Sequence, residues 1–516
     1  MQDSGATTSV WQDGTVLPAY PPLTDDTYAD VCVVGAGVAG LTTAYLLGRE
    51  GKTVIVLDLG TVASGETSRT TAHLSAILDD RYYEIERLHG EYGARLAAES
   101  HLAAIDRIES IVSSEDIDCG FARVDGYLFL GHGDAPTELD RELSALRRVG
   151  IPGVSWLVRA PAAPFDTGFC LHVPRQAQFD PLKYLAALSR AVIRDGGRIF
   201  GATRAVEMRG GVPARVRTAA GHTVTAGAVV VATNTPVNDI VTMHTKQAAY
   251  RTYVIGLTVP PGAIEPALYW DTGRPYHYVR VRPAANSGPD VLLVGGEDHK
   301  TGQADDPERR FARLEQWARA RAPDAGIVAY RWSGQVVEPV DGLAFIGRNP
   351  GVVPNIYIAT GDAGNGMTHG TIAGMLLTDL IAERENPWAK LYDPSRRSVR
   401  SASEFVRENL NVAGRYARWV TPGQVPRVSD IAPGDGAVIR RGISKVACYR
   451  DEAGVLHERS AVCPHLYCIV EWNSTERTWD CPCHGSRFDA YGTVISGPSV
   501  SNLPPVDDAT PAPGSR

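Results

Sequence analysis

The 516 residues of the chain exceed one compact domain and predict about two to four domains. The composition, 44% apolar and 21% charged, is that of an ordinary globular protein. A net charge of -8 without a long basic run argues against nucleic acid as the main partner, and no apolar segment is long enough to span a membrane. The N-terminus lacks the basic and apolar regions of a signal peptide, so we expect a cytoplasmic protein.

A dinucleotide-binding pattern follows a Pro-rich leader, residues 1–29. Residues 30–34 predict a buried parallel strand that runs into the motif G-x-G-x-x-G and a helix. The motif glycines, which permit a tight turn, close approach to a pyrophosphate and close helix packing, are Gly35, Gly37 and Gly40. Asp58 ends the next predicted strand, where an acidic side chain can bind the adenosine ribose hydroxyls. This unit predicts a dinucleotide site but does not decide between FAD and NAD.

Two further segments are suited to FAD. Residues 64–73 are small and polar and could wrap a second phosphate and the flavin, although by composition alone an ordinary Ser/Thr loop is the simpler interpretation. Residues 355–360 predict a strand that leads through a Gly-rich turn into a helix, whose positive N-terminus can approach the flavin. The residues assigned to FAD in these segments are Thr67, Thr70, Thr71, Gly361, Gly364, Gly366 and Met367.

From about residue 30 to residue 382 the chain resembles FAD-dependent oxidoreductases of the glycine oxidase and D-amino-acid oxidase type. The resemblance is carried by the dinucleotide unit, by Phe179-Asp180-Pro181 before a helix, by a strand at 229–234, and by the turn at 361–366. It implies FAD and an α/β Rossmann-like FAD-binding domain, residues 30–390, with an inserted α+β substrate domain.

The inserted substrate sheet offers the candidate catalytic residues. Two insert regions fit, residues 81–154 and 246–296, and the second concentrates aromatic and cationic side chains. If one face of its strand points at the flavin, Arg280 could pair with a substrate carboxylate while Tyr278 shapes the cavity. An exposed edge strand fits this pattern equally well. His73 is a further candidate by its position in the FAD segment, although a structural histidine is the more common role.

Two Cys/His clusters lie near the C-terminus, in a region of short predicted strands, residues 426–516, that follows a linker at 391–425. Their spacing is C-x-H, fifteen residues, then C-x-x-H. A Rieske [2Fe-2S] centre needs such a set, because two thiolates hold one iron and two imidazoles the other. A tetrahedral zinc site is the alternative. The proposed ligands are Cys463, His465, Cys481 and His484.

This region resembles the Rieske subunits of quinol-oxidising electron-transport complexes. In those subunits the cysteines equivalent to Cys468 and Cys483 form a disulfide that ties the two cluster loops together, so the resemblance implies the same pair here. Pro498 matches the proline loop of that family, whereas Tyr467 stands where it usually has Gly. The whole chain also looks like bacterial proteins that join an FAD domain to a C-terminal, small all-β Rieske domain.

Together these features predict a dehydrogenase. It would oxidise a C–N bond of an amine or amino acid and pass electrons from FAD through the cluster to an external acceptor, a protein or a quinone. A relay reductase without an organic substrate of its own is the alternative. A Rieske-type oxygenase is disfavoured, because the sequence has no D/E-x-x-H-x-x-x-x-H run for a mononuclear iron.

Overall fold

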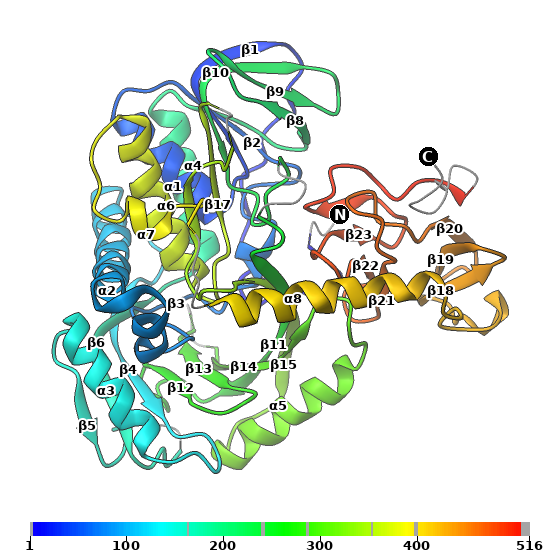
Figure 1. The fold of residues 1–516 in the computed structure, drawn as a ribbon. Coiled ribbons are helices and arrows are strands. Elements are labelled where there is room, and N and C mark those ends of the chain that lie inside the picture. Colours follow the sequence, from blue (N-terminus) through cyan, green and yellow to red (C-terminus); the bar gives the residue numbers. More distant parts are fainter. Residues whose placement is uncertain are drawn as a thin grey trace.

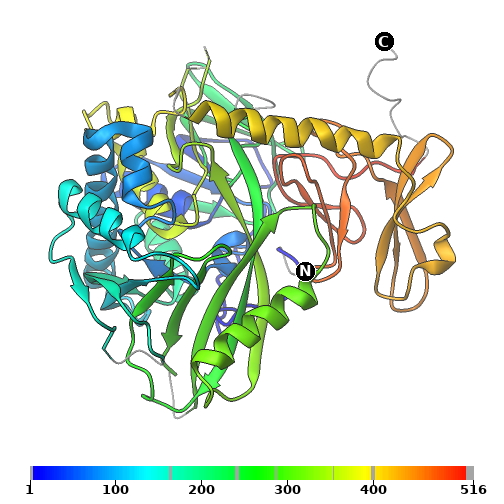
Figure 2. The same cartoon turned by 60° about the horizontal axis from the view of Figure 1, so that its bottom comes forward.

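The computed structural model describes residues 4–161, 165–238, 243–284, 288–351, 354–396 and 401–506. Two large sheets with their helices form an N-terminal domain, and two small sheets form a C-terminal domain (Figure 1). A helix, α8 (Ala402–Arg415), crosses the outside of the molecule from one domain to the other, as Figure 2 shows. Within the described residues, no helix has the length and apolar character needed to cross a membrane.

The first sheet is the parallel sheet that the dinucleotide pattern predicts. Its strands, in spatial order, are β16 (Phe345–Arg348), β17 (Ile356–Thr360), β10 (Thr223–Val231), β1 (Thr27–Val34), β2 (Val54–Leu57) and β7 (Arg198–Phe200). All neighbours pair in parallel except β16, which is antiparallel to β17, and a hairpin of β8 (Ala205–Arg209) and β9 (Ala214–Thr218) extends β10. β2 and the second half of β1 are wholly buried, as a sheet covered on both faces requires.

Helices pack on the first sheet and against one another. They include α1 (Val38–Arg49), α4 (Pro181–Arg194) and α6 (Gly366–Ile381). α1 and α6 approach closely because Gly374 has no side chain; a Cβ there would lie 2.5 Å from Cγ2 of Thr42. α4 begins as its sequence predicts, since Asp180 accepts two backbone N–H groups of the first turn and Pro181 occupies the first helical position.

The second sheet is the inserted substrate sheet. In spatial order its strands are β15 (Val328–Pro339), β11 (Gln247–Val259), β14 (Asp290–Lys300), β13 (His277–Arg282), β12 (Leu268–Asp271), β4 (Ala122–Phe129), β6 (Cys170–Gln178) and β3 (His73–Leu74), with β5 (Ser155–Leu157) beside β6. The remaining helices of the N-terminal domain are α2 (Tyr82–Ser114), α3 (Thr137–Val149), α5 (Pro307–Arg321) and α7 (Ala389–Tyr392). α5 packs on β11 and β14 and closes a separate apolar core around Leu314.

The C-terminal domain is all-β. One sheet contains β18 (Gly436–Arg441), β19 (Ser444–Arg450) and β20 (Leu456–Ser460), and the other contains β21 (Glu471–Asn473), β22 (Thr478–Asp480), β23 (Arg487–Asp489) and β24 (Val494–Ser496). The sheet of β18 to β20 lies far from the N-terminal domain, whereas the sheet of β21 to β24 lies beside it (Figure 1). The cluster loops therefore face the N-terminal domain rather than the outside of the molecule.

The predicted leader and linker both take part in the folded structure. Trp11 is buried, and its Nε1 donates to the backbone oxygen of Thr70 at 2.6 Å. The linker carries α8 and contacts both domains. Asn409 donates to the backbone oxygen of Thr245 in the N-terminal domain, and the Tyr416 hydroxyl donates to the backbone oxygen of Leu466 in the C-terminal domain. These two segments connect the domains instead of separating them.

Candidate active site and iron-sulfur site

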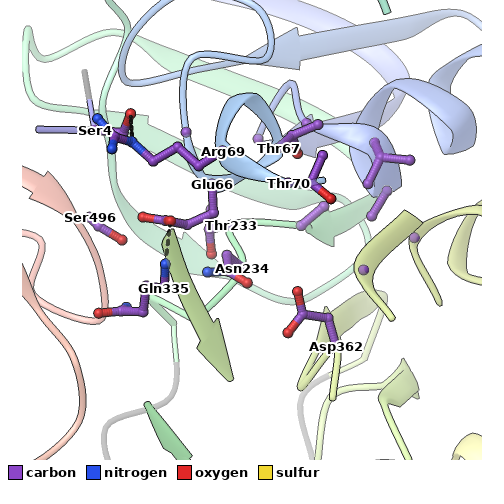
Figure 3. A pocket seen from close by; sticks show the side chains of 18 of the residues that line it. Ser4, Glu66, Thr67, Arg69, Thr70, Thr233, Asn234, Gln335, Asp362 and Ser496 are labelled. Carbon is purple, nitrogen blue, oxygen red and sulfur yellow. Dashed lines mark hydrogen bonds between the residues drawn. The ribbon is translucent and has the colours of Figure 1, made fainter. Parts of the chain in front are cut away.

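A cavity of about 690 Å³ lies between the two large sheets and the C-terminal domain. It lies at the carboxyl ends of β1, β2 and β10, the edge where open α/β sheets bind ligands. Its volume is within the range of about 300–1,000 Å³ typical of small-molecule and cofactor pockets. Figure 3 shows that residues of the N-terminal domain and Ser496 of the C-terminal domain surround one space.

The first turn of the dinucleotide unit depends on its glycines. Gly35 has a φ of +109°, and a Cβ on it would lie 2.3 Å from the backbone oxygen of Ala232. A Cβ on Gly40 would lie 1.9 Å from the backbone oxygen of Gly35, so this glycine serves helix packing and does not line the cavity. Gly37 does line it, which leaves the backbone open to a pyrophosphate.

The other residues assigned to FAD all line the cavity. They are Asp58, Thr67, Thr70, Thr71, Gly361, Gly364, Gly366 and Met367. Asp58 also holds the glycine turn in place, because its Oδ2 accepts the backbone N–H of Ala36 at 2.6 Å and its Oδ1 that of Gly60 at 2.8 Å.

Several polar groups in the cavity wall fit FAD. Nδ2 of Asn234 and Oδ1 of Asn365 are buried and have no hydrogen-bond partner in the described parts of the chain. Asn365 stands at the start of α6, where no side chain caps the backbone N–H groups. Buried polar groups are normally paired, so these donors and acceptors indicate a polar ligand. The residues present thus suit FAD, because the N-terminus of α6, the positive end of the helix dipole, lines the cavity and could bind an electron-rich group.

The second sheet and the segment after β3 supply an aromatic and acidic wall. Trp270, Tyr276, Tyr278 and Asp79 line the cavity there. The Tyr276 hydroxyl donates to Oδ2 of Asp79 at 3.4 Å, and burial raises the pKa of Asp79 to about 7. Among the described cavity-lining residues of the second sheet there is no Arg or Lys. This wall therefore offers a carboxyl group and ring faces to a ligand, but its described residues include no Arg or Lys that would form an ion pair with a carboxylate.

A second carboxyl lies behind the aromatic wall. Burial raises the pKa of Asp298 to about 6, while hydrogen bonds from Thr252 and Tyr276 act in the opposite direction. Oγ1 of Thr252 also lies 2.9 Å from the Tyr278 hydroxyl. The two tyrosines are thereby held in place by a polar network at the edge of the cavity.

The structure corrects the role expected for Arg280. This side chain is 2% exposed, does not line the cavity, and donates through Nη1 to the backbone oxygens of Thr71 and Ala72. Arg280 lies two residues after Tyr278 on the same strand. Its guanidinium contacts the predicted FAD segment, residues 64–73, and donates to backbone carbonyl groups there. Arg280 therefore braces the cavity wall and is not placed to bind a substrate carboxylate.

His73 and Tyr278 do line the cavity, as expected for candidate catalytic residues. Burial lowers the pKa of His73 to about 3, with the charge of Arg280 acting in the same direction. Nδ1 of His73 lies 3.0 Å from Oγ1 of Thr71, and Nε2 lies 3.4 Å from the backbone oxygen of Val279. His73 is thus a neutral, hydrogen-bonded ring at neutral pH.

The four proposed cluster ligands lie together. Cys463 and Cys481 are buried and hydrogen-bonded through their thiols, and the rings of His465 and His484 are 5.1 Å apart. Burial lowers the pKa of His484 to about 3, so its imidazole is neutral, the form that binds a metal. Two thiols beside two imidazoles suit the two kinds of iron site in a Rieske cluster.

A disulfide joins the two cluster loops, as the resemblance implied. It links Cys468 and Cys483, whose Cα atoms are 6.4 Å apart. One of these residues lies in each loop, so the bond fixes the distance between the two ligand pairs.

Comparison with known proteins identifies both parts of the chain. The sequence profile of the DAO family, FAD dependent oxidoreductase, matches residues 30–380. The chain belongs to this family. A second profile, the Rieske [2Fe-2S] domain, matches residues 421–507. We refer to these two segments as the oxidoreductase domain and the Rieske domain; their presence implies FAD and a [2Fe-2S] cluster.

Individual relatives support the same division. A Bacillus subtilis (strain 168) protein named as a Rieske 2Fe-2S iron-sulfur protein, YhfW, is 33% identical over 96% of this chain and 97% of its own length. The gamma-glutamylputrescine oxidoreductase of Escherichia coli (strain K12) is 26% identical over 72% of this chain and 88% of its own. Glycine oxidase from Geobacillus kaustophilus, with a TM-score of 0.60 and 20% identity over 72% of this chain and 99% of its own, has a similar fold.

Buried ion pairs join the oxidoreductase domain to the Rieske domain. Nη1 of Arg69 lies 3.0 Å from Oε1 of Glu476, and Nη2 of Arg251 lies 3.5 Å from Oδ2 of Asp480. All four side chains are at most 2% exposed. Burial raises the pKa of Glu476 and Asp480, but the arginine charges outweigh it and hold both pKa values below their usual range. The Rieske domain is therefore fixed by paired charges.

Sequence reasoning missed the residues that connect the two halves of the site. Asp79, Gln335 and Glu66 line the cavity, and His244 lies against the cluster histidines. Glu66 lies in the predicted FAD segment, residues 64–73, but received no role there, and the other three lie outside every motif that predicted a site. Their roles follow from which strands and loops the fold brings together.

Proposed function

We propose that the chain is a FAD-dependent dehydrogenase that oxidises the C–N bond of a cationic amine and passes the electrons through the Rieske cluster to an external acceptor. The observation that carries the substrate class is the wall formed by Asp79, Tyr276, Tyr278 and Trp270. A carboxyl group among aromatic rings attracts an ammonium group through charge and through the ring faces. An amino acid would also need a partner for its carboxylate, which the described part of this wall lacks, so an amine is favoured.

The chemistry divides between cofactors and chain. When bound, FAD supplies a two-electron acceptor and the cluster a one-electron carrier. The cationic amine loses one proton and one hydride and becomes a protonated imine. Asp79 would hold the ammonium group of the incoming amine, and Tyr276 would orient Asp79 by its hydrogen bond. The main contribution of the chain is thus to place the substrate C–H bond, because orientation provides a large share of rate enhancement.

Two comparisons support the proposal. The Escherichia coli relative is named for gamma-glutamylputrescine, an amine. The relative from Bacillus subtilis aligns along nearly all of this chain, Rieske domain included. The acceptor beyond the cluster would be a protein or a quinone that takes one electron at a time.

Anaerobic flavin bleaching tests this function. The purified holoprotein is mixed with a panel of primary and secondary amines, amino acids and hydroxy acids, and flavin absorbance is followed. We expect bleaching by amines and little by amino acids. If no organic compound bleaches the flavin but reduced ferredoxin or NAD(P)H does, the protein is a relay reductase and the dehydrogenase proposal is wrong.

A further inference from the structure

The oxidoreductase domain places a histidine of its own against the cluster ligands. His244, between β10 and β11, is 3% exposed. Its ring centroid lies 4.7 Å from that of His465 and 5.6 Å from that of His484. The planes are inclined at 78° and 57°, so the edge or face of one ring meets another. The oxidoreductase domain therefore covers the side of the cluster site on which the two histidines lie.

Gln335 links the FAD cavity to the second cluster loop. It lies on β15, is 3% exposed and lines the cavity. Its Nε2 donates to the backbone oxygen of Gly485 at 3.1 Å, and Gly485 directly follows the ligand His484. The path from cavity wall to ligand thus consists of one side chain, one hydrogen bond and one stretch of backbone.

The second loop can approach β11 and β15 closely because residue 485 is glycine. Gly485 has a φ of +78°, and a Cβ on it would lie 2.5 Å from the Cβ of Ala249 and 3.0 Å from Nε2 of Gln335. Any larger residue would push the loop off the oxidoreductase domain. The close contact therefore depends on residues of both domains, Gly485 in the second cluster loop and Ala249 and Gln335 in the oxidoreductase domain.

The backbone of Gln335 is itself anchored to the interface. Its N–H donates to Oε2 of Glu66 at 2.6 Å, and Oε1 of the same carboxylate accepts from Nη1 of Arg487 at 2.8 Å. Figure 3 shows the Glu66 carboxylate directed at Gln335. One carboxylate thereby holds β15 and the strand that follows the second cluster loop.

We propose that Gln335 and His244 form the internal electron-transfer contact, holding the cluster histidines toward FAD and away from external partners. They act as positioning residues. The direction of electron flow, from FAD to the cluster, rests on the proposed function. Each transfer removes one electron from reduced FAD and adds one to the oxidised cluster. Two transfers, separated by reoxidation of the cluster by the external one-electron acceptor, would remove the two electrons of one substrate hydride and release its one proton to solvent.

The test uses single-electron injection into the holoprotein, without any organic substrate. Laser flash photolysis of 5-deazariboflavin with EDTA as sacrificial donor reduces the protein, and the absorbance of flavin and cluster follows the redistribution of electrons between them. The variants are Gln335→Leu, which keeps the size but removes the donor, and His244→Ala. His222→Ala, in the turn between β9 and β10, is the control, because His222 lies outside the cavity and the cluster site.

We expect both variants to retain about two irons per chain and a Rieske electron paramagnetic resonance signal. The transfer rate should fall by about tenfold or more, since small misplacements of reacting groups have effects of this size. The His244→Ala signal should also change in shape, and His244→Phe should restore packing and part of the rate. Wild-type rates with unchanged signals in Gln335→Leu and His244→Ala would overturn the proposal.

Loss of iron from a variant is also informative. If His244→Ala loses the cluster while His244→Phe keeps it and transfers at the wild-type rate, His244 only stabilises the fold and the proposal fails for this residue. Because the reductant is chemical, failure to find an amine substrate would contradict the proposed function and leave this result intact.

Discussion

Glu66 of the oxidoreductase domain and Arg487 of the Rieske domain are paired at 2.8 Å, 421 residues apart in sequence, in the wall of the cavity. Arg487 is fully buried and also lies 3.3 Å from Asp480. Removing one partner of such a group leaves an unpaired buried charge, which is costly. The position of the cluster relative to the cavity therefore depends on this residue.

Arg487→Met should lower the stability of the protein by about 3–5 kcal/mol, the usual cost of breaking a buried ion pair. Chemical unfolding followed through cluster absorbance measures the change. Arg209→Met, which breaks an exposed pair with Glu207, should have little effect. Equal shifts in the two variants would contradict the central role of Arg487.

Acidification should weaken the interface between the oxidoreductase domain and the Rieske domain. The pKa values of Glu476 and Asp480 are held below their usual range by Arg69, Arg251 and Arg487. Their contribution to stability is complete above the unfolded pKa of about 4 and is lost as pH falls through the lower folded values. The melting temperature of wild type should therefore fall below about pH 4, and Glu476→Gln should reduce this dependence.

Gly35→Ala should yield protein without FAD, because the new Cβ would meet the backbone oxygen of Ala232 at 2.3 Å and the φ of +109° disfavours alanine. The ratio of flavin absorbance to protein after purification measures this. Gly48→Ala is the control: it lies in α1 with open space around it and should bind FAD normally, with stability raised by up to about 1 kcal/mol. Normal flavin content in Gly35→Ala would contradict the assigned site.

Cys481→Ser should abolish the low-g-average electron paramagnetic resonance signal of a reduced Rieske centre. Cys448→Ser should retain it, since Cys448 is a buried cysteine of β19 outside the ligand set. Metal analysis provides the check on identity. Zinc without iron in the wild-type protein would show that the four ligands hold a different metal.

Asp79 should set the pH dependence of amine oxidation. Burial raises its pKa to about 7, with Asp80 and Asp298 acting in the same direction and Arg81 and Tyr276 opposing them. An ionised carboxylate binds a cationic amine better, so kcat/KM should rise through about pH 7. Asp79→Asn should flatten this rise and lower kcat/KM by about 10- to 100-fold, the value of a hydrogen bond to a charged group. A retained rise in this variant would assign the titration to another group.

Local patterns in the sequence were sufficient to identify the two cofactors. The strand, glycines and Asp58 lie within one continuous unit, and the cluster ligands lie in two short loops, so spacing alone reports the geometry. The resemblance to Rieske subunits predicted the disulfide between Cys468 and Cys483, because these residues lie in the same two short loops. Arg280 was misjudged because strand alternation gives the face of a side chain but not what covers that face.

What the sequence by itself determined is the pair of cofactors, FAD on a dinucleotide fold and a [2Fe-2S] cluster, for which Cys463, His465, Cys481 and His484 remain the proposed ligands. Only the tertiary structure decided how the two are joined. Asp79, His244 and Gln335 acquire their roles through strands and loops distant in the chain, and no local pattern encodes such contacts. Long-range packing brings these residues together, which is why the proposed electron path and the proposed preference for a cation rest on the folded chain and not on any local pattern.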